Sequence, residues 1–313
     1  MRRLMKETTL TTDDFICPIF VDEGAKTKIM IDSMPGIYRI PLEEVAAEVA
    51  TVRDLGIPAV MLFGIPSEKN DAGSNAYSTN GIIQQATREI RKSDQDMVIM
   101  TDVCMCQYTS SGHCGIIKNG RVDNDSSRKA LVDIAISQAE AGSNVMTPSA
   151  MVDGQVAAIR SALDDAGFVD VVIMSQSAKH RSNFYAPFRD AAECAPKFGD
   201  RRAYQVPFTN ARESIREMET DAAEGVDIIM IKPALAYMDL IVEAKKRFNL
   251  PVSAYNVSGE YALVMAAAQN GWIPKDELAY EILSSIKRAG ADMIATYFAK
   301  QMATFLNETG SKV

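Results

Sequence analysis

The chain has 313 residues and a formal net charge of −8 at pH 7, and 47% of its residues are hydrophobic. This acidic balance argues against nucleic acid as a general partner, because phosphate binding requires a basic surface. No apolar run in the sequence approaches the roughly 20 residues needed to span a membrane, and the first residues turn polar too early for a signal peptide. We therefore expect a cytoplasmic protein that binds neither nucleic acid nor membrane.

Eight short apolar runs, rich in Ile, Val, Met and Phe, are spaced along the chain. They cover residues 16–21, 59–65, 97–103, 144–150, 171–179, 228–234, 251–257 and 293–299. Runs of this length that are apolar almost throughout are typical of parallel strands buried on both faces. We expect each run to form one strand of a parallel sheet.

Segments with helical spacing separate these runs. They cover residues 41–55, 82–92, 128–141, 154–166, 212–223, 237–248, 261–269 and 276–289. Several are followed by a glycine, such as Gly56 or Gly142, which supplies the left-handed backbone that ends a helix. Eight alternations of strand and helix predict an α/β protein with a single (β/α)8 TIM barrel over residues 14–313, after a short N-terminal arm of residues 1–13. A doubly wound sheet is the alternative.

A barrel of this kind carries its chemistry at the carboxyl ends of its strands and in the loops that follow them. Polar side chains occur at these ends in the last six predicted strands: Asp102, Ser149, Lys179, Lys232, Tyr255 with Ser258, and Tyr297. We expect all of these side chains to face one cavity.

Two of these residues are lysines that follow buried strands, Lys179 and Lys232. Burial or a neighbouring cation lowers the pKa of a lysine, so that more of it is the neutral amine that attacks a ketone. Two such amines indicate two carbonyl substrates bound through Schiff bases. The alternative for either lysine alone is an ordinary solvated side chain.

Three cysteines lie within eleven residues, Cys104, Cys106 and Cys114. Three thiolates can occupy three corners of a zinc tetrahedron and leave the fourth position for water or substrate, as in a catalytic site. We expect the neighbouring His113 to lie outside the coordination shell. The alternative is three ordinary reduced thiols. Cys17 is expected to be a buried, inert thiol, and the sequence indicates no role for Cys194.

Two predicted loops are long for a barrel, residues 104–127 and 180–211. Long loops are usually functional or disordered. The second contains aromatic and arginine side chains and little low-complexity sequence, so we interpret it as an active-site lid, called the lid segment below. A disordered surface loop is the alternative.

Taken together, these residues resemble the porphobilinogen synthase family, also called 5-aminolevulinate dehydratase. The resemblance extends from about Glu7 to Phe298 and rests on several sequence blocks in the same order. They are residues 101–115, 122–125, 148–150 with 153–155, 174–179, 184–189, 230–233 and 257–261.

The resemblance implies an enzyme, a hydro-lyase of tetrapyrrole (heme) biosynthesis, that condenses two 5-aminolevulinate molecules into porphobilinogen with loss of two waters. It implies that Lys232 binds the substrate that supplies the propionate side, with Ser258 and Tyr297 at its carboxylate. Lys179 would then bind the second substrate, which supplies the acetate side.

The remaining roles also follow from the resemblance. Arg189 and Arg201 would hold the carboxylate of the second substrate, a task that suits the planar, permanently charged guanidinium. Asp102 and Ser149 would contact the first substrate's amino group, and Asp102 would move protons. The three cysteines match the ligands of the zinc-dependent members, where the ion polarises the substrate or supplies a base.

Glu217 matches a position that binds an activating magnesium at a subunit contact, with a solvated helix carboxylate as the alternative.

The resemblance also implies a homo-oligomer. The octamer is favoured, but the arm is short for the family, so a smaller assembly such as a hexamer or dimer is the alternative. His180 follows Lys179 where an aromatic residue is common, and Met151-Val152 alters the block after Ser149.

Two rival functions remain open at this stage. The first is a barrel aldolase or lyase in which only one of the two lysines forms an imine. That rival leaves the three clustered cysteines without a role. The second is a non-catalytic metal-binding protein that uses the cysteine loop. Such a protein would have no reason to place two lysines and two arginines around the same cavity.

Overall fold

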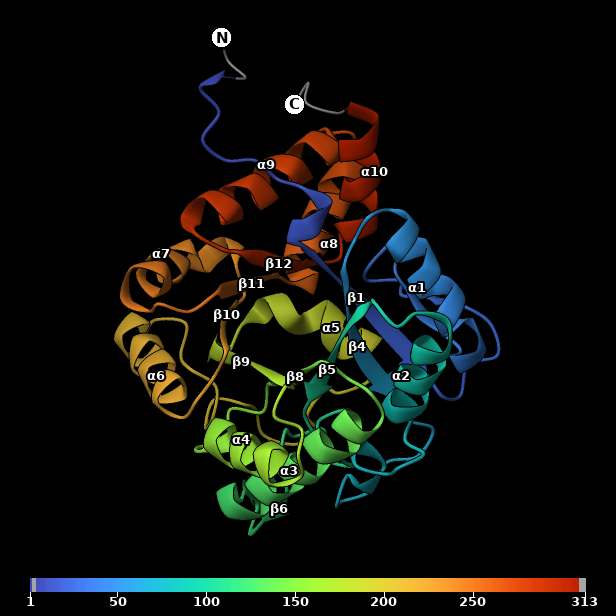
Figure 1. Ribbon diagram of the computed structural model, residues 1–313, viewed down its shortest axis with the longest axis vertical. Coiled ribbons are helices and arrows are strands. Elements are labelled where there is room, and N and C mark those ends of the chain that lie inside the picture. Colours follow the sequence, from blue (N-terminus) through green and yellow to red (C-terminus); the bar gives the residue numbers. More distant parts are fainter. Residues whose placement is uncertain (2–3, 310–313) are drawn as a thin grey trace.

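The computed structural model describes residue 1 and residues 4–309, and within them eight parallel strands close into a barrel surrounded by helices (Figure 1). The barrel strands are β1 (Phe15–Asp22), β4 (Ala59–Ile65), β5 (Val98–Val103), β8 (Val145–Pro148), β9 (Val172–Lys179), β10 (Ile228–Lys232), β11 (Val252–Asn256) and β12 (Met293–Thr296). The sheet closes because β12 pairs with β1, with Phe15 opposite Ile294. The predicted (β/α)8 barrel is confirmed, and the doubly wound alternative is wrong.

Helices cover the outside of the barrel. They are α1 (Val45–Asp54), α2 (Ile82–Ser93), α3 (Asn124–Glu140), α4 (Gln155–Asp165), α6 (Ala211–Ala223), α7 (Met238–Arg247), α8 (Ser258–Gln269), α9 (Lys275–Ala289) and α10 (Ala299–Thr309). Residues 2–3 of the expected arm and residues 310–313 of the expected barrel domain lie outside the described residues.

Two of the differences from the sequence expectation concern helices α10 and α3. Helix α10 was not predicted, and its first residue, Ala299, was assigned to the apolar run that forms β12. As the predicted ranges imply, both α8 and α9 lie between β11 and β12, and α10 is the helix that follows the last strand. Helix α3 starts four residues before its predicted first residue, because the Asp123 carboxylate caps it by accepting a 3.0 Å hydrogen bond from the Ser126 amide.

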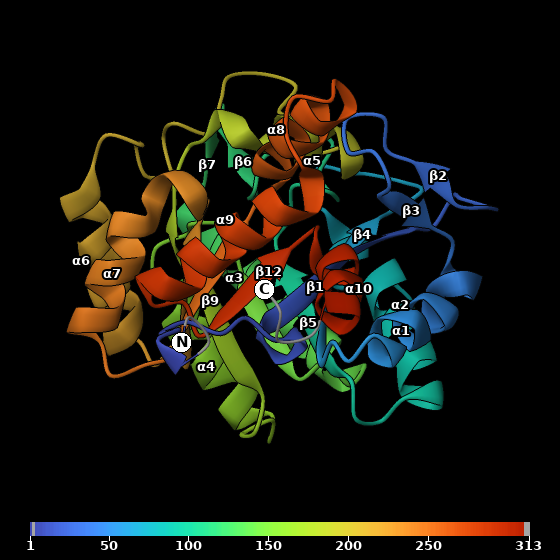
Figure 2. The ribbon, with the colours of Figure 1, turned by 90° about the horizontal axis from the view of Figure 1, so that it is seen from above.

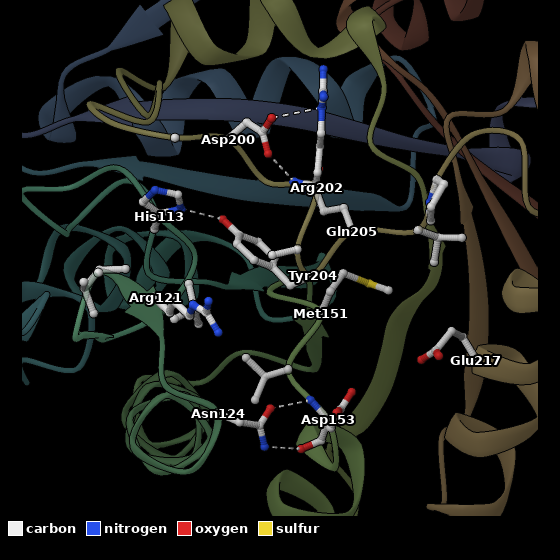
Figure 3. A pocket seen from close by; sticks show the side chains of 18 of the residues that line it. His113, Arg121, Asn124, Met151, Asp153, Asp200, Arg202, Tyr204, Gln205 and Glu217 are labelled. Atoms are coloured by element: carbon white, nitrogen blue, oxygen red, sulfur yellow. Dashed lines mark hydrogen bonds and ion pairs between the residues drawn. The ribbon is translucent and has the colours of Figure 1, made fainter.

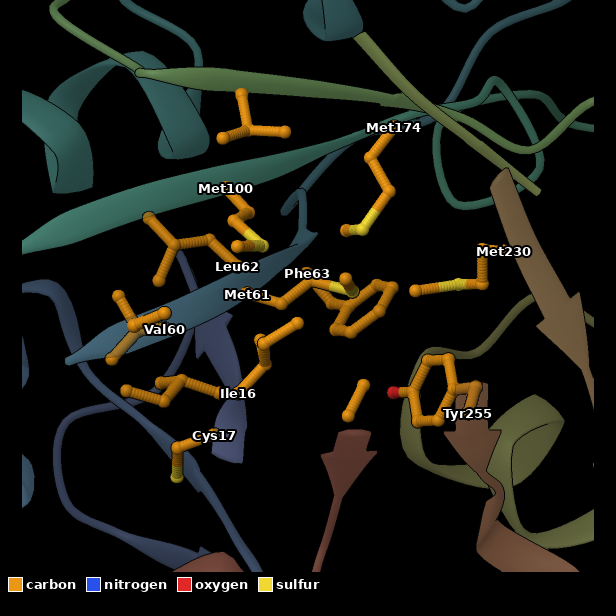
Figure 4. Close-up of a cluster of buried hydrophobic side chains, with 14 of the residues drawn as sticks. Ile16, Cys17, Val60, Met61, Leu62, Phe63, Met100, Met174, Met230 and Tyr255 are labelled. Atoms are coloured by element: carbon orange, nitrogen blue, oxygen red, sulfur yellow. The ribbon is translucent and has the colours of Figure 1, made fainter. Parts of the chain in front are cut away.

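The inside of the barrel is filled with apolar side chains. Figure 4 shows Met61, Phe63, Met100, Met174 and Met230 pointing toward one another between the strands. All five are at most 5% exposed. Because this packing occupies the barrel's interior, a polar reaction site is restricted to the mouth.

The two long loops carry short elements of their own. Loop 104–127 contains the antiparallel pair β6 (Ile117–Lys118) and β7 (Arg121–Val122), and the lid segment contains α5 (Ala186–Ala191). A further pair, β2 (Ile29–Met30) and β3 (Tyr38–Ile40), follows β1. Figure 2 shows α5, α8, β6 and β7 at the same end of the barrel.

None of the helices in the described part of the chain combines the length and apolar character that crossing a bilayer demands.

Candidate active site

The two lysines lie side by side at the barrel mouth. Strands β9 and β10 are neighbours, and their register places Lys179 directly opposite Lys232. An irregularity in β9 produces this pairing, since Ser175 and Ala178 lie opposite Ile229 and Ile231, with one extra residue in β9. The side chains are 6% and 5% exposed, so the two amines share one buried region. Their convergence is what two-substrate Schiff-base chemistry requires.

Aromatic rings surround the Lys232 amine. Its Nζ lies 4.3 Å from the ring centre of Tyr255 and 5.3 Å from that of Phe188. Burial lowers the pKa of Lys232 to about 7, and the positive charge of Lys179 acts in the same direction. A large part of this amine is therefore neutral near pH 7, as a nucleophile must be.

Lys179 and Asp102 are held by nearby polar groups. The Lys179 ammonium donates a 2.5 Å hydrogen bond to the Ser149 carbonyl oxygen, so Ser149 contacts the lysine through its backbone. The Asp102 carboxylate accepts a 3.1 Å hydrogen bond through Oδ2 from the Gln107 amide. Its Oδ1 is buried and has no hydrogen-bond partner among the described residues. This oxygen is available to a substrate amino group or a proton.

The three cysteines of loop 104–127 converge as expected. Their sulfur atoms all lie within 4.8 Å of one another, and the thiols of Cys104 and Cys106 are 3.5 Å apart. Each cysteine is at most 4% exposed. Hydrogen bonds from Cys104 and Cys106 hold the pKa of Cys114 well below its usual value, and the charges of Arg201 and Lys179 also lower it. Soft sulfur donors at this spacing fit a zinc ion.

Both ring nitrogens of His113 contact oxygen atoms of the lid segment, so neither is free to bind a metal ion. Its Nδ1 lies 3.0 Å from the Tyr204 hydroxyl and its Nε2 lies 3.0 Å from the Phe198 carbonyl oxygen. Both partners belong to the lid segment. His113 therefore joins loop 104–127 to the lid segment.

The two arginines of the lid segment lie near this centre. Arg201 is 5% exposed and donates hydrogen bonds to the carbonyl oxygens of Cys194, at 2.6 Å, and Gly112, at 3.0 Å. Burial lowers the pKa of Arg189, and the charge of Arg201 lowers it further. The Nε atoms of both arginines are buried, with no partner in the described part of the chain. A carboxylate bound here would neutralise two adjacent cations.

Ser258 bonds to the lid segment, and the two tyrosines of the site bond to each other. The Ser258 hydroxyl donates to the Phe184 carbonyl oxygen at 3.1 Å and accepts from the Phe188 amide at 3.0 Å. The Tyr255 and Tyr297 hydroxyls are 3.1 Å apart. Ser258 thus anchors the lid segment to the start of α8, a contact that the sequence did not indicate.

The same contact allows the position of the lid segment to be tested by a substitution at Gly259. A Cβ atom at Gly259 would lie 2.5 Å from the Phe184 carbonyl oxygen and 2.6 Å from its Cα, so the segment must shift. We expect Gly259→Ala to lower kcat by up to about 10²-fold, because displaced groups lose their orientation. Turnover and limited proteolysis of the lid segment measure the effect.

Gly24→Ala is the matched control, because a Cβ there meets only the Asp22 carboxylate at 3.5 Å. It should keep wild-type turnover. Wild-type turnover by Gly259→Ala as well would show that the lid segment's position does not matter.

Glu217 lies apart from the lysines, in α6 on the wall of a neighbouring cavity (Figure 3). Glu213 and Asp153 line the same cavity. Burial raises the pKa of Glu217, and the charges of Asp221, Asp153 and Glu213 raise it further. Neighbouring carboxylates that repel one another are suited to a hard divalent cation.

Two further polar side chains at the site were missed by the sequence reasoning. Gln107 lies between the Asp102 carboxylate, at 3.1 Å, and the Cys106 thiol, at 3.3 Å. Gln205 of the lid segment is 2% exposed, and neither of its amide atoms has a partner in the described ranges. A glutamine carries no strong sequence signal, since only the fold reveals its burial beside charged groups.

Comparison with known proteins agrees with this geometry. The model of the family described as delta-aminolevulinic acid dehydratase matches residues 1–305. The chain belongs to this family. A delta-aminolevulinic acid dehydratase of Archaeoglobus fulgidus is 53% identical over 303 residues, which cover 97% of this chain and 94% of that protein. One from Bacillus subtilis is 50% identical over 308 residues, covering 98% and 95%.

A solved structure of a delta-aminolevulinic acid dehydratase (porphobilinogen synthase) from Toxoplasma gondii ME49 has the same fold. It superposes with a TM-score of 0.97 at 38% sequence identity and covers 99% of this chain and 90% of its own. That structure is a complex with the reaction product porphobilinogen. The resemblance stated from the sequence is confirmed.

Proposed function

We propose that this chain condenses two 5-aminolevulinate molecules into porphobilinogen through Schiff bases on Lys232 and Lys179. The observation that carries the proposal is the register of β9 and β10, which places both amines in one buried mouth. Each amine that attacks a ketone forms an imine and releases one water. Two neighbouring imines hold the two substrates at a distance where bonds can form between them.

The side chains around each lysine support the assignment of one substrate to each of them. Lys232 would hold the propionate-side substrate, with Ser258, Tyr255 and Tyr297 at one end of it. Tyr255 also covers the amine and excludes water. Release of the Ser258 hydroxyl from the lid backbone would allow it to donate to the carboxylate of this substrate.

Lys179 would hold the acetate-side substrate, with its carboxylate between Arg189 and Arg201. The Nε donor of each guanidinium group has no partner among the described residues, which supports the binding of an anion here. Asp102, whose Oδ1 has no partner among the described residues, and Ser149, whose carbonyl oxygen accepts the Lys179 hydrogen bond, would contact the amino group of the substrate on Lys232. Gln107 fixes the other Asp102 oxygen, so the carboxylate keeps its orientation.

Cys104, Cys106 and Cys114 would hold a zinc ion next to Lys179. When bound, the ion would supply Lewis-acid polarisation of the substrate. The burial of all three thiols and their spacing support this assignment. The cations of Arg201 and Lys179 near Cys114 stabilise the negative charge that three thiolates bring.

Several wider properties belong to the same proposal. The lid segment would open to admit substrate, and residues 1–13 would act as an arm in a homo-oligomer. Glu217 would contribute to a magnesium site with Asp153 or Glu213. The five cysteines, all of them free, suit a reducing compartment such as the cytoplasm.

The pH dependence of turnover should follow Lys232. Its pKa lies at about 7, so protonation below that value removes the neutral amine. We expect kcat/KM to rise with pH up to about 7 and then to level off until another group titrates. A rise centred near the ordinary lysine pKa of 10.5 would contradict a desolvated nucleophile. Initial rates across a pH series in buffers of constant ionic strength provide the measurement.

The direct test of the function is pyrrole formation from 5-aminolevulinate by purified, zinc-loaded protein. Borohydride reduction during turnover should then leave secondary-amine adducts on both Lys179 and Lys232, which peptide mass spectrometry locates. No pyrrole with zinc present would defeat the proposal. Pyrrole with an adduct on one lysine only, even at saturating substrate, would favour the one-imine mechanism.

A further inference from the structure

A buried carboxylate at the start of α8 binds groups from outside its own helix. Glu260 is 1% exposed. Its Oε1 accepts a 2.8 Å hydrogen bond from the Leu235 amide, which lies in the connection after β10. Its Oε2 accepts a 2.8 Å hydrogen bond from the Asn256 side-chain amide and a 2.9 Å hydrogen bond from the Val257 backbone amide. One side chain therefore joins the connection after β10 to the end of β11 and the start of α8.

The bonding continues from β11 into β12. The Asn256 carbonyl oxygen Oδ1 accepts a 2.9 Å hydrogen bond from the hydroxyl of Thr296, the last residue of β12. Asn256 and Thr296 are both completely buried and lie opposite each other in the sheet. We call Leu235, Asn256, Val257, Glu260 and Thr296 the Glu260 network. It spans the carboxyl ends of three neighbouring strands, β10, β11 and β12 (Figure 1).

Each of the other four network residues is close along the chain to a residue expected at the propionate-side substrate. The pairs are Leu235 with Lys232, Asn256 with Tyr255, Val257 with Ser258, and Thr296 with Tyr297. A shift in the network would therefore change the separation between the Lys232 amine and the hydroxyls expected at the substrate carboxylate. Misplacement of such groups by about 1 Å is enough to impair a reaction.

The hydrogen bonds of Glu260 go beyond helix capping. A carboxylate at the third position of a helix caps it by accepting from the amide just before the helix, here that of Val257. The bonds from Leu235 and Asn256 contribute nothing to that cap. All three donors are neutral amides, so hydrogen bonds alone offset the cost of burying the charge. An uncharged side chain would avoid this cost, which indicates a role for the bonds to the two strand ends.

We propose that Glu260 is a positioning residue of the propionate-side subsite, and that its network sets the distance from the Lys232 amine to the hydroxyls of Ser258 and Tyr297. The inference rests on the proposed function, which assigns these groups to one substrate. A keto acid must place its ketone at the amine and its carboxylate at the hydroxyls at the same time. The network therefore selects for the length of chain between ketone and carboxylate.

Reductive trapping of levulinic acid at each lysine tests this inference. Levulinic acid has the ketone and the carboxylate of 5-aminolevulinate without the amino group, so it can form an imine but no pyrrole. The amine adds to the ketone with loss of one water, and borohydride then donates a hydride to the imine carbon and leaves a secondary amine. Peptide mass spectrometry gives the levulinic acid concentration for half-maximal trapping at Lys232 and at Lys179.

The pH of the experiment keeps Glu260 ionised. Burial raises the pKa of Glu260 to about 7. Trapping is therefore carried out at about pH 8.5, where the carboxylate is charged.

Glu260→Gln keeps the size of the side chain and removes its charge and one acceptor oxygen. We expect the concentration for half-maximal trapping at Lys232 to rise about tenfold, because hydrogen bonds to a charged group are lost. The value at Lys179, outside the network, should not change. The variant should trap 2-pentanone, which has no carboxylate, at Lys232 as well as the wild type does. A variant that is merely less stable would not distinguish between the two lysines or the two ketones.

Asp292→Asn is the matched control. The Asp292 carboxylate accepts a 2.7 Å hydrogen bond from the Val252 amide, so it joins β11 and β12 at their amino ends, away from the mouth. This control should leave trapping at both lysines unchanged. Thr296→Val is a second, milder test, because it removes the hydroxyl that binds Asn256 and leaves Glu260 in place. We expect a roughly threefold rise at Lys232 in this variant.

The outcomes separate this inference from the function on which it rests. Unchanged trapping at Lys232 in Glu260→Gln, or an equal rise at both lysines or with both ketones, would overturn the positioning role. If Glu260→Gln does not fold, unchanged trapping at Lys232 in Thr296→Val overturns it instead. A wild type that forms no levulinic acid adduct at Lys232 and no pyrrole from 5-aminolevulinate would refute the proposed function itself.

Discussion

Replacing either Lys232 or Lys179 with methionine is expected to lower kcat for porphobilinogen formation by roughly 10³-fold or more, because each variant lacks one covalent attachment. The lysines are paired across neighbouring strands, so neither can take the other's place without moving its strand. Initial rates of pyrrole formation at saturating 5-aminolevulinate measure the loss. Lys129→Met, in α3 away from the mouth, is a control that should retain wild-type activity.

Stability measurements distinguish this loss from misfolding. The pKa of Lys232 falls from 10.5 to about 7 on folding, so the folded state binds the proton less tightly. The buried lysine therefore costs stability at every pH below 10.5, and the cost is complete below about 7. Methionine removes this cost, so Lys232→Met should melt at or above the wild-type temperature at pH 7. An inactive variant that melts much lower would leave the catalytic role unsupported.

Removing the metal should have an effect of similar size. We expect zinc chelation, or Cys106→Ala, to abolish pyrrole formation, because the three converging thiols fit one ion beside Lys179. Added zinc should restore the chelated wild type and leave Cys106→Ala inactive. Metal content by atomic emission should fall from one bound zinc per chain to none in the variant.

The control for the cysteine substitution is Cys17→Ala, which also removes a buried thiol but leaves the cluster intact. It should keep its zinc and its activity. Chelated protein that forms pyrrole at the wild-type rate would refute the metal role while leaving the two-lysine mechanism in place.

The order of strands and the positions of both lysines could be predicted from the sequence. Parallel barrel strands are buried on both faces, so each one appears as a continuous apolar run, and the polar residue that follows it marks the mouth. The cysteine cluster could also be predicted from the sequence, because the three residues are close together along the chain in any fold. Helix α10 was not predicted, since its first residue, Ala299, was assigned to the apolar run of β12.

Tertiary contacts decided the rest. The extra residue in β9 that sets Lys179 opposite Lys232 and the burial of Gln205 both depend on segments that are distant in sequence. Local patterns report which residues are buried and which end a strand, because propensity and polarity act over a few neighbours. Which side chains meet across a loop depends on packing between elements, and that information exists only in the folded chain.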